Sequence, residues 1–160
     1  MLALAACSKP EAPTVAPAAP APPRAAAPQA KPAAPVATTD PVALTALLKQ
    51  GEAIFENTCA TCHMADGGGV PNMQPSIIGS AWISNPDPQL LLSLILRGAT
   101  VMGEAANAYD NKMPPLDHLS DAEIAAVASY VRSRFAAVPI TVPVTPPQVA
   151  IARKRPGLPE

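Results

Sequence analysis

Apolar residues early in the middle part of the chain recur at intervals of three and four, the spacing of one face of a helix. Asp40 and Pro41 precede this series, and they supply a capping side chain and a proline that suits the first helical position. The series consists of Leu44, Leu47, Leu48, Gly51, Ile54, Phe55 and Cys59. We therefore predict a helix that begins at residue 41 and reaches the cysteine.

Two later segments carry the same kind of helix signal. Asp87-Pro88 precedes the apolar residues 89–97, and Gly98 follows them as a suitable C-terminal stop. Ser120-Asp121-Ala122-Glu123 is a capping box, and apolar positions continue after it at helical spacing. No segment alternates apolar and polar residues as a half-buried strand does. The pattern predicts an all-α domain over residues 42–137, with three main helices and long irregular connections.

The two flanks of this domain differ from it in composition. Residues 8–41 contain 12 alanines and 10 prolines among 34 residues, and proline at this density excludes helix and sheet. We expect a disordered, extended linker with a reach on the order of 100 Å. Residues 138–160 are also rich in proline and contain the basic run Arg153-Lys154-Arg155. We expect an extended, disordered tail in which this run is solvated.

The composition excludes several classes of protein. The chain has 160 residues, 22 of them proline, and its net charge of −1 provides no electrostatic attraction to nucleic acid. Its apolar runs are shorter than the roughly 18 residues that a membrane-spanning helix requires. Aromatic residues make up only 3%, so the core is small and marginal by itself. We therefore expect a bound group to fill part of the core, and no nucleic-acid partner.

Cys59-Ala60-Thr61-Cys62-His63 has the C-x-x-C-H spacing of covalent haem c attachment. Residues three and four apart share a helix face, so both thiols can bond to the haem vinyl groups while the imidazole lies under the iron. The motif has two other uses. A thioredoxin-like dithiol needs a βαβ context that the pattern lacks, and a zinc site would depend on the distant His118. We expect one covalent haem c per chain.

These motifs resemble those of the class I cytochrome c family over nearly all of residues 42–137. The family has a small residue, an aromatic residue and the first cysteine at intervals of four, as in Gly51, Phe55 and Cys59. The resemblance implies that the glycine lets the first and last helices cross closely, against an aromatic residue that corresponds to Tyr130. It also implies the cytochrome c fold, with its helices and loops around the haem.

Two further motifs of the family bear on the ligands of the iron. Pro75-Ser76-Ile77-Ile78-Gly79 matches its proline loop, which implies that the Pro75 carbonyl accepts a hydrogen bond from the His63 imidazole. Lys112-Met113-Pro114-Pro115-Leu116 is similar to its axial-methionine loop, which implies that Met113 is the sixth ligand of the iron. More narrowly, the chain is similar to cytochrome c subunits and domains of periplasmic dehydrogenases, including quinohaemoprotein alcohol dehydrogenases.

The sixth ligand decides between two functions. Met113 is stiffened by the two prolines that follow it, and the alternatives are Met73, Met102 and His118. With His63 and Met113 both bound, the iron has no open position for a substrate. We therefore expect a carrier of single electrons and not an enzyme. The alternative is a haem enzyme of the peroxidase type, if the sixth ligand is labile.

Two residues are candidate partners of the haem propionates. Trp82 follows the proline loop, where its indole N–H either donates to a propionate or packs in the core. Arg97 closes the helix over residues 89–97, and its guanidinium is a second candidate. We expect both residues to contribute to cofactor binding.

Leu4-Ala5-Ala6-Cys7 fits the bacterial lipobox, in which the cysteine is lipidated after signal cleavage. Only six residues precede Cys7 and none is basic, so we expect a truncated or misassigned start. The interpretation is a periplasmic protein anchored to a bacterial membrane by lipid. Its expected partners are a dehydrogenase that donates electrons and an oxidase or other cytochrome that accepts them for the respiratory chain. A zinc-binding structural lipoprotein is a further alternative.

Overall fold

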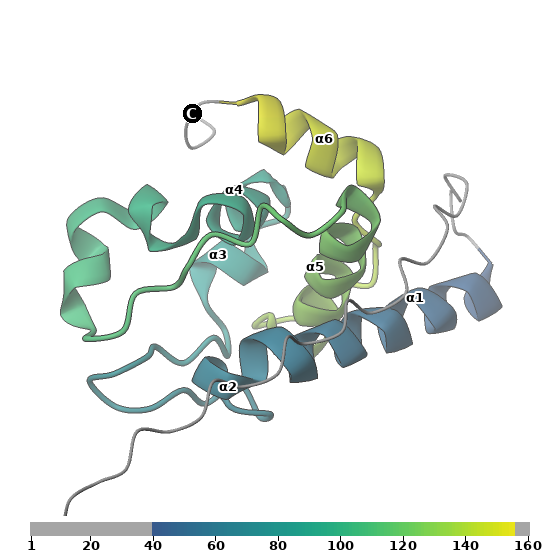
Figure 1. The fold of residues 1–160 in the computed structure, drawn as a ribbon. Coiled ribbons are helices and arrows are strands. Elements are labelled where there is room, and N and C mark those ends of the chain that lie inside the picture. Colours follow the sequence, from purple (N-terminus) through teal and green to yellow (C-terminus); the bar gives the residue numbers. More distant parts are fainter. Residues whose placement is uncertain (1–39, 156–160) are drawn as a thin grey trace, which may run out of the picture. The chain divides into compact units, whose positions relative to one another are not determined.

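The computed structural model describes residues 40–155, without the side chains of residues 105–107. This part of the chain is helical and has no strand, apart from an isolated bridge between Val70 and Gln74. The helices are α1 (Pro41–Ile54), the π-helix η1 (Phe55–Cys59), α2 (Ala60–His63), α3 (Ala81–Ser84), α4 (Gln89–Arg97), the 3₁₀ segment η2 (Gly98–Ala108), α5 (Asp121–Phe135) and α6 (Pro146–Lys154), as Figure 1 shows. The predicted all-α fold class is confirmed. None of the helices in the described range has the length and apolar character needed to cross a membrane.

The three main helices begin and end where the sequence predicts. Asp40 caps α1 by accepting a hydrogen bond from the Val42 amide at 2.9 Å, and the helix runs without interruption into η1 and α2. The capping box of α5 is present, since the Ser120 amide donates to the Glu123 carboxylate at 2.8 Å. Residue 98 ends α4 at φ +65°, a conformation that glycine adopts without strain.

The first and last helices of the predicted domain, α1 and α5, cross at Gly51. A Cβ atom at position 51 would overlap the Ala126 carbonyl oxygen and lie 2.7 Å from the Tyr130 Cβ. The Phe55 ring packs beside this crossing, with its centroid 5.6 Å from that of Tyr130 and 5.1 Å from that of Phe135. The close crossing that the resemblance implied is therefore confirmed, and it explains why only glycine fits at position 51.

Replacing Gly51 by valine is expected to force α1 and α5 apart. Overpacking at a close helix crossing costs about 3 kcal/mol of unfolding free energy, which corresponds to a fall in Tm of roughly 10 °C or more for a domain of this size. Thermal unfolding followed by circular dichroism measures the change. Ala53→Val, at an exposed position of the same helix, is the control for the lower helix propensity of valine. Equal losses of Tm in the two variants would contradict the packing argument.

The C-terminal segment differs from the sequence prediction. It was expected to be an extended tail, and this is wrong for residues 146–154, which form α6 and pack against α4 and α5 (Figure 1). Proline is compatible with the first two helical positions because their amides have no partner inside the helix. The Thr145 amide donates to Gln148 Oε1 at 2.8 Å, and the side chains of Val149 and Ala152 are fully buried. Burial of these two residues stabilises a helix that the proline content of the segment did not predict.

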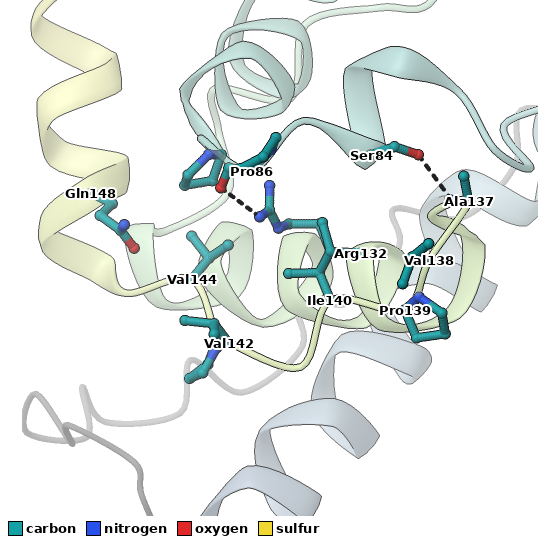
Figure 2. A pocket seen from close by; sticks show the side chains of 12 residues that line it. Ser84, Pro86, Arg132, Ala137, Val138, Pro139, Ile140, Val142, Val144 and Gln148 are labelled. Atoms are coloured by element: carbon teal, nitrogen blue, oxygen red, sulfur yellow. Dashed lines mark hydrogen bonds between the residues drawn. The ribbon is translucent and has the colours of Figure 1, made fainter.

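The segment that leads to α6 lies over the turn between α3 and α4. Figure 2 shows the Arg132 side chain of α5 reaching the Pro86 carbonyl, to which it donates at 2.9 Å. Arg132 also donates to the Asn85 carbonyl at 2.8 Å, and the Ala137 amide donates to the Ser84 hydroxyl at 2.9 Å. The chain after α5 is therefore held against the domain from its first residues onward.

Candidate functional site

A deep, largely apolar cavity lies between the helices, bounded by η1, α2, α3, α4, α5 and the chain around residues 109–116. The cavity is open to solvent and has a volume of about 210 Å³. Its apolar walls include Phe55, Ile83, Leu91, Ile95, Val127 and Val131. An open cavity with apolar walls supplied by several helices fits a flat, mostly hydrophobic group.

The predicted site residues fall into three sets with respect to this cavity. Cys59, Cys62, His63, Pro75, Trp82 and Met113 line it. Arg97 is not among its lining residues, and Cys7 lies outside the described residues. The cavity therefore gathers most of the site that the motifs predict, from segments as far apart as residues 59 and 113.

Cys59 and Cys62 approach the cavity from the end of η1 and from α2. Both are half-buried free thiols. Burial, with a smaller contribution from the charge of Cys62, raises the pKa of the Cys59 thiol to about 11. A reactive redox dithiol has a lowered thiol pKa, so Cys59 is unlike the nucleophile of a thioredoxin-type site.

A zinc site also lacks support within residues 40–155. No group of three or more His, Cys, Asp and Glu side chains in that range is arranged to hold a metal ion. His118, the residue on which the zinc interpretation depended, is exposed and does not line the cavity.

The His63 imidazole is oriented by a hydrogen bond to the loop opposite it. His63 Nδ1 lies 3.2 Å from the Pro75 carbonyl oxygen. A carbonyl oxygen only accepts, so Nδ1 carries the proton and Nε2 keeps its lone pair for a metal. Burial lowers the pKa of His63, and the Pro75 carbonyl opposes this shift in part. The lowered pKa favours the neutral imidazole, the form that binds iron.

Two of the five methionines line the cavity, Met102 and Met113. Met64 and Met73 are 36% and 43% exposed and do not line it, and Met1 lies outside the described residues. Position alone therefore leaves two candidate thioether ligands within reach of the cavity.

The backbone of Met113 is held tightly against the end of α4. The Ala99 amide donates to the Met113 carbonyl at 2.8 Å. A Cβ atom at Gly98 would overlap that same carbonyl oxygen and come within 2.7 Å of the Pro114 carbonyl carbon. Glycine is required here both for its positive φ and for this contact of the two chain segments.

The two propionate candidates have different surroundings. Trp82 is half-buried in the cavity wall at the start of α3, where the Ser80 hydroxyl accepts from its backbone amide at 3.3 Å. Arg97 points to the C-terminal helix, since its guanidinium donates to the Ala152 carbonyl at 2.9 Å and to that of Arg155. Sequence reasoning did not single out Gln74, which lines the cavity and has a buried Oε1 without a hydrogen-bond partner. No motif spacing marks that glutamine.

Comparison with known proteins decides what kind of domain surrounds this cavity. The family profile described as cytochrome c matches residues 48–135, which is more than half of the chain. The chain belongs to the cytochrome c family. Residues 48–135 are therefore a cytochrome c domain, which belongs to a family of electron carriers with covalent haem c that are not themselves catalytic.

Several curated proteins are similar to this cytochrome. The cytochrome c subunit of a quinone-type alcohol dehydrogenase from Gluconobacter oxydans is 33% identical over 95 residues, which cover 55% of this chain and 20% of that subunit. A cbb3-type cytochrome c oxidase subunit from Rhodobacter capsulatus is 39% identical over 85 residues, or 52% of this chain and 28% of the subunit. Cytochrome c6 from Cyanidium caldarium is 30% identical over 97 residues, or 61% of this chain and 80% of that protein. The matched region is only about a fifth of the length of the dehydrogenase subunits.

The residues of the cavity fit the haem c that the family implies. Two thiols three residues apart can form the two thioether bonds, and a neutral imidazole with a free Nε2 follows them directly. The apolar walls suit the porphyrin faces, and two methionine side chains are available on the lining. The chemistry of this donor set therefore agrees with the family.

Proposed function

We propose that Cys59 and Cys62 attach the haem and that His63 and Met113 are the ligands of its iron. The single observation that carries this proposal is the gathering of these four side chains on one apolar cavity, with Met113 drawn in from 50 residues beyond His63. Bound in this way, the haem supplies a one-electron couple with a raised potential and no free coordination position.

Met113 is a better candidate than Met102 because its backbone is fixed. Two prolines follow Met113, and its carbonyl accepts a hydrogen bond from the Ala99 amide, directly after the end of α4. Met102 lies in η2, where the next residue, Gly103, departs from helical geometry at φ 56° and ψ −134°. A weak thioether ligand is held better by a rigid loop than by a kinked one. The same rigidity opposes the haem-enzyme alternative, which requires a labile sixth ligand.

We further propose that the cytochrome takes electrons from a dehydrogenase and passes them toward the respiratory chain. The names of its relatives support this role, because they include subunits of alcohol, fructose and gluconate dehydrogenases and of cbb3-type oxidases. We place the protein in the periplasm, attached to a bacterial membrane through a lipid on Cys7. The lipobox-like Leu4-Ala5-Ala6-Cys7 supports the anchor, which would raise the effective concentration of the cytochrome near membrane-bound partners.

One experiment tests the carrier role and the anchor together. The full-length cytochrome and its Cys7→Ser variant are mixed with a membrane-bound dehydrogenase from the source cells, and haem reduction is followed by stopped-flow absorbance. We expect the wild type to partition into membranes and to be reduced there about tenfold faster, or more, than Cys7→Ser. With detergent-solubilised dehydrogenase the two proteins should be reduced at equal rates.

The lipid anchor and the proposed electron donor are contradicted by different results. Equal membrane partitioning of the wild type and Cys7→Ser would reject the anchor. Absence of reduction by any dehydrogenase of the source cells would reject the proposed donor, while leaving the haem assignment intact.

A further inference from the structure

The helix α6 lies beyond the part of the chain that matches the cytochrome c family. The match ends at residue 135, whereas α6 begins at Pro146. Its inner face is fully buried at Val149 and Ala152, against α4 and α5 (Figure 1). The contacts of α6 therefore add to the packing contacts within the family domain at residues 48–135.

Polar bonds fix α6 along α4. At its first turn, Gln89 Nε2 donates to the Gln148 carbonyl at 3.1 Å. At its last turn, Arg97 donates to the carbonyls of Ala152 and Arg155, and the Ala152 carbonyl also accepts from the Arg155 amide at 3.3 Å. A cation at this end also suits the negative end of the helix dipole. Both ends of α6 are thus tied to the helix that forms one wall of the cavity.

Arg153 extends from α6 to the chain just after Met113. Its Nε lies 2.6 Å from Asp121 Oδ1, and its guanidinium donates to the Asp117 carbonyl at 2.8 Å and to the Leu119 carbonyl. One side chain thus binds three groups within residues 117–121. The planar guanidinium, with its fixed set of donors, suits such a multiple contact.

The same stretch of chain is also bound near its other end. The Ala99 amide of η2 donates to the Met113 carbonyl at 2.8 Å, and the Leu116 amide donates to the Ile95 carbonyl of α4 at 2.9 Å. The segment from Met113 to Leu119 is therefore bonded to Ala99 and Ile95 in its first part and to Arg153 at its end. To move Met113 out of the cavity, the protein would have to break one set of these bonds or bend the segment between them.

We propose that α6 is a strap that holds the sixth-ligand loop against the cavity, and that Arg153 is its positioning residue. The inference rests on the proposed role of Met113 as ligand. If Arg153 released residues 117–119, the loop would open more often, and the Met113 thioether, as the weaker of the two residues that would hold the iron, would spend more time away from it.

The test uses the holoprotein with Arg153→Gln, which keeps a polar side chain but shortens it and removes its charge and its fork of donors. Two quantities are measured: the rate at which the ferric protein binds cyanide, and the exchange rate of the backbone amides of Met113 and of residues 116–119. We expect both rates to rise about tenfold relative to the wild type. Lys154→Gln is the matched control, since it removes one exposed charge from the same helix and should leave both rates unchanged.

Two further variants support the interpretation. Arg153→Lys keeps the attraction to Asp121 without the planar fork, so its rates should lie between those of the wild type and Arg153→Gln. Asp121→Asn removes the ion pair and leaves the two carbonyl acceptors, so a smaller increase in the same rates is expected. Asp121→Asn also serves if Arg153→Gln yields no holoprotein.

The possible results distinguish failure of the proposed role of α6 from failure of the assignment of Met113 as ligand. If Arg153→Gln lowers Tm but has the cyanide and exchange rates of Lys154→Gln, the strap is wrong and Arg153 is merely structural. If Met113→Ala, measured in the same assay, leaves the cyanide rate unchanged, the ligand assignment fails instead.

Discussion

Replacing Met113 by alanine is expected to change the spectrum, the reduction potential and the ligand binding of this cytochrome together. The ferric protein should lose the weak long-wavelength band that a thioether–iron bond produces. The reduction potential should fall by on the order of 100 mV, a small part of the roughly 0.8 V that axial ligands span. Cyanide should bind the opened iron position at least about a hundredfold faster, because no loop movement has to precede it. Visible spectroscopy and a redox titration measure these changes.

Met102→Ala and Met73→Ala are the controls for this substitution. Met102 also lines the cavity but lies in η2, and Met73 is 43% exposed and lies outside the lining. Both variants should keep the band. Loss of the band in Met102→Ala, with retention in Met113→Ala, would show that the ligand comes from η2.

The haem is expected to be as important for folding as for electron transfer. The double variant Cys59→Ala, Cys62→Ala, purified without haem, should show no cooperative thermal transition in far-UV circular dichroism. Its apolar cavity would fill with water or collapse without the haem, and either change removes packing from the helices that line it. A group bound only by the native state contributes its binding free energy to stability. This protein has few aromatic side chains, so the packing of its own core cannot make up for that contribution when the haem is absent.

Thr61→Ala is the control for substitution within the C-x-x-C-H motif, since it keeps both cysteines and His63. This variant should load haem and unfold cooperatively at the Tm of the wild type. A sharp transition of the haem-free double variant near that Tm would disprove the structural role of the haem.

Helix boundaries in this protein were predictable because they depend on neighbours in sequence. Asp40 and the Ser120–Glu123 box satisfy amides within three residues, and Gly98 ends α4 through its own backbone conformation. The C-x-x-C-H motif is equally local, since its three functional side chains lie within five residues. The crossing at Gly51 is a long-range contact, and it was accessible only through resemblance to a known family.

Arg97 shows why other residues were not predictable. A cation at the end of a cavity-lining helix is a reasonable propionate partner, yet its guanidinium bonds to the Ala152 and Arg155 carbonyls, more than 50 residues away. A long side chain can reach several acceptors, and sequence spacing does not say which one the fold brings near. The role of Arg153, which was expected to be solvated, was hidden for the same reason.

The sequence by itself determined the positions of α1, α4 and α5 and the haem-binding motif, because each depends on residues within a few turns of one another. Only the tertiary structure decided that α6 forms, that Met102 and Met113 are the methionines on the cavity, and that the chain after Met113 is bonded to Ile95 and Arg153. The prolines of the C-terminal segment predict an extended chain when considered alone. The burial of Val149 and Ala152 against α4 and α5 outweighs that tendency, and burial is a property of the packed fold rather than of the local sequence.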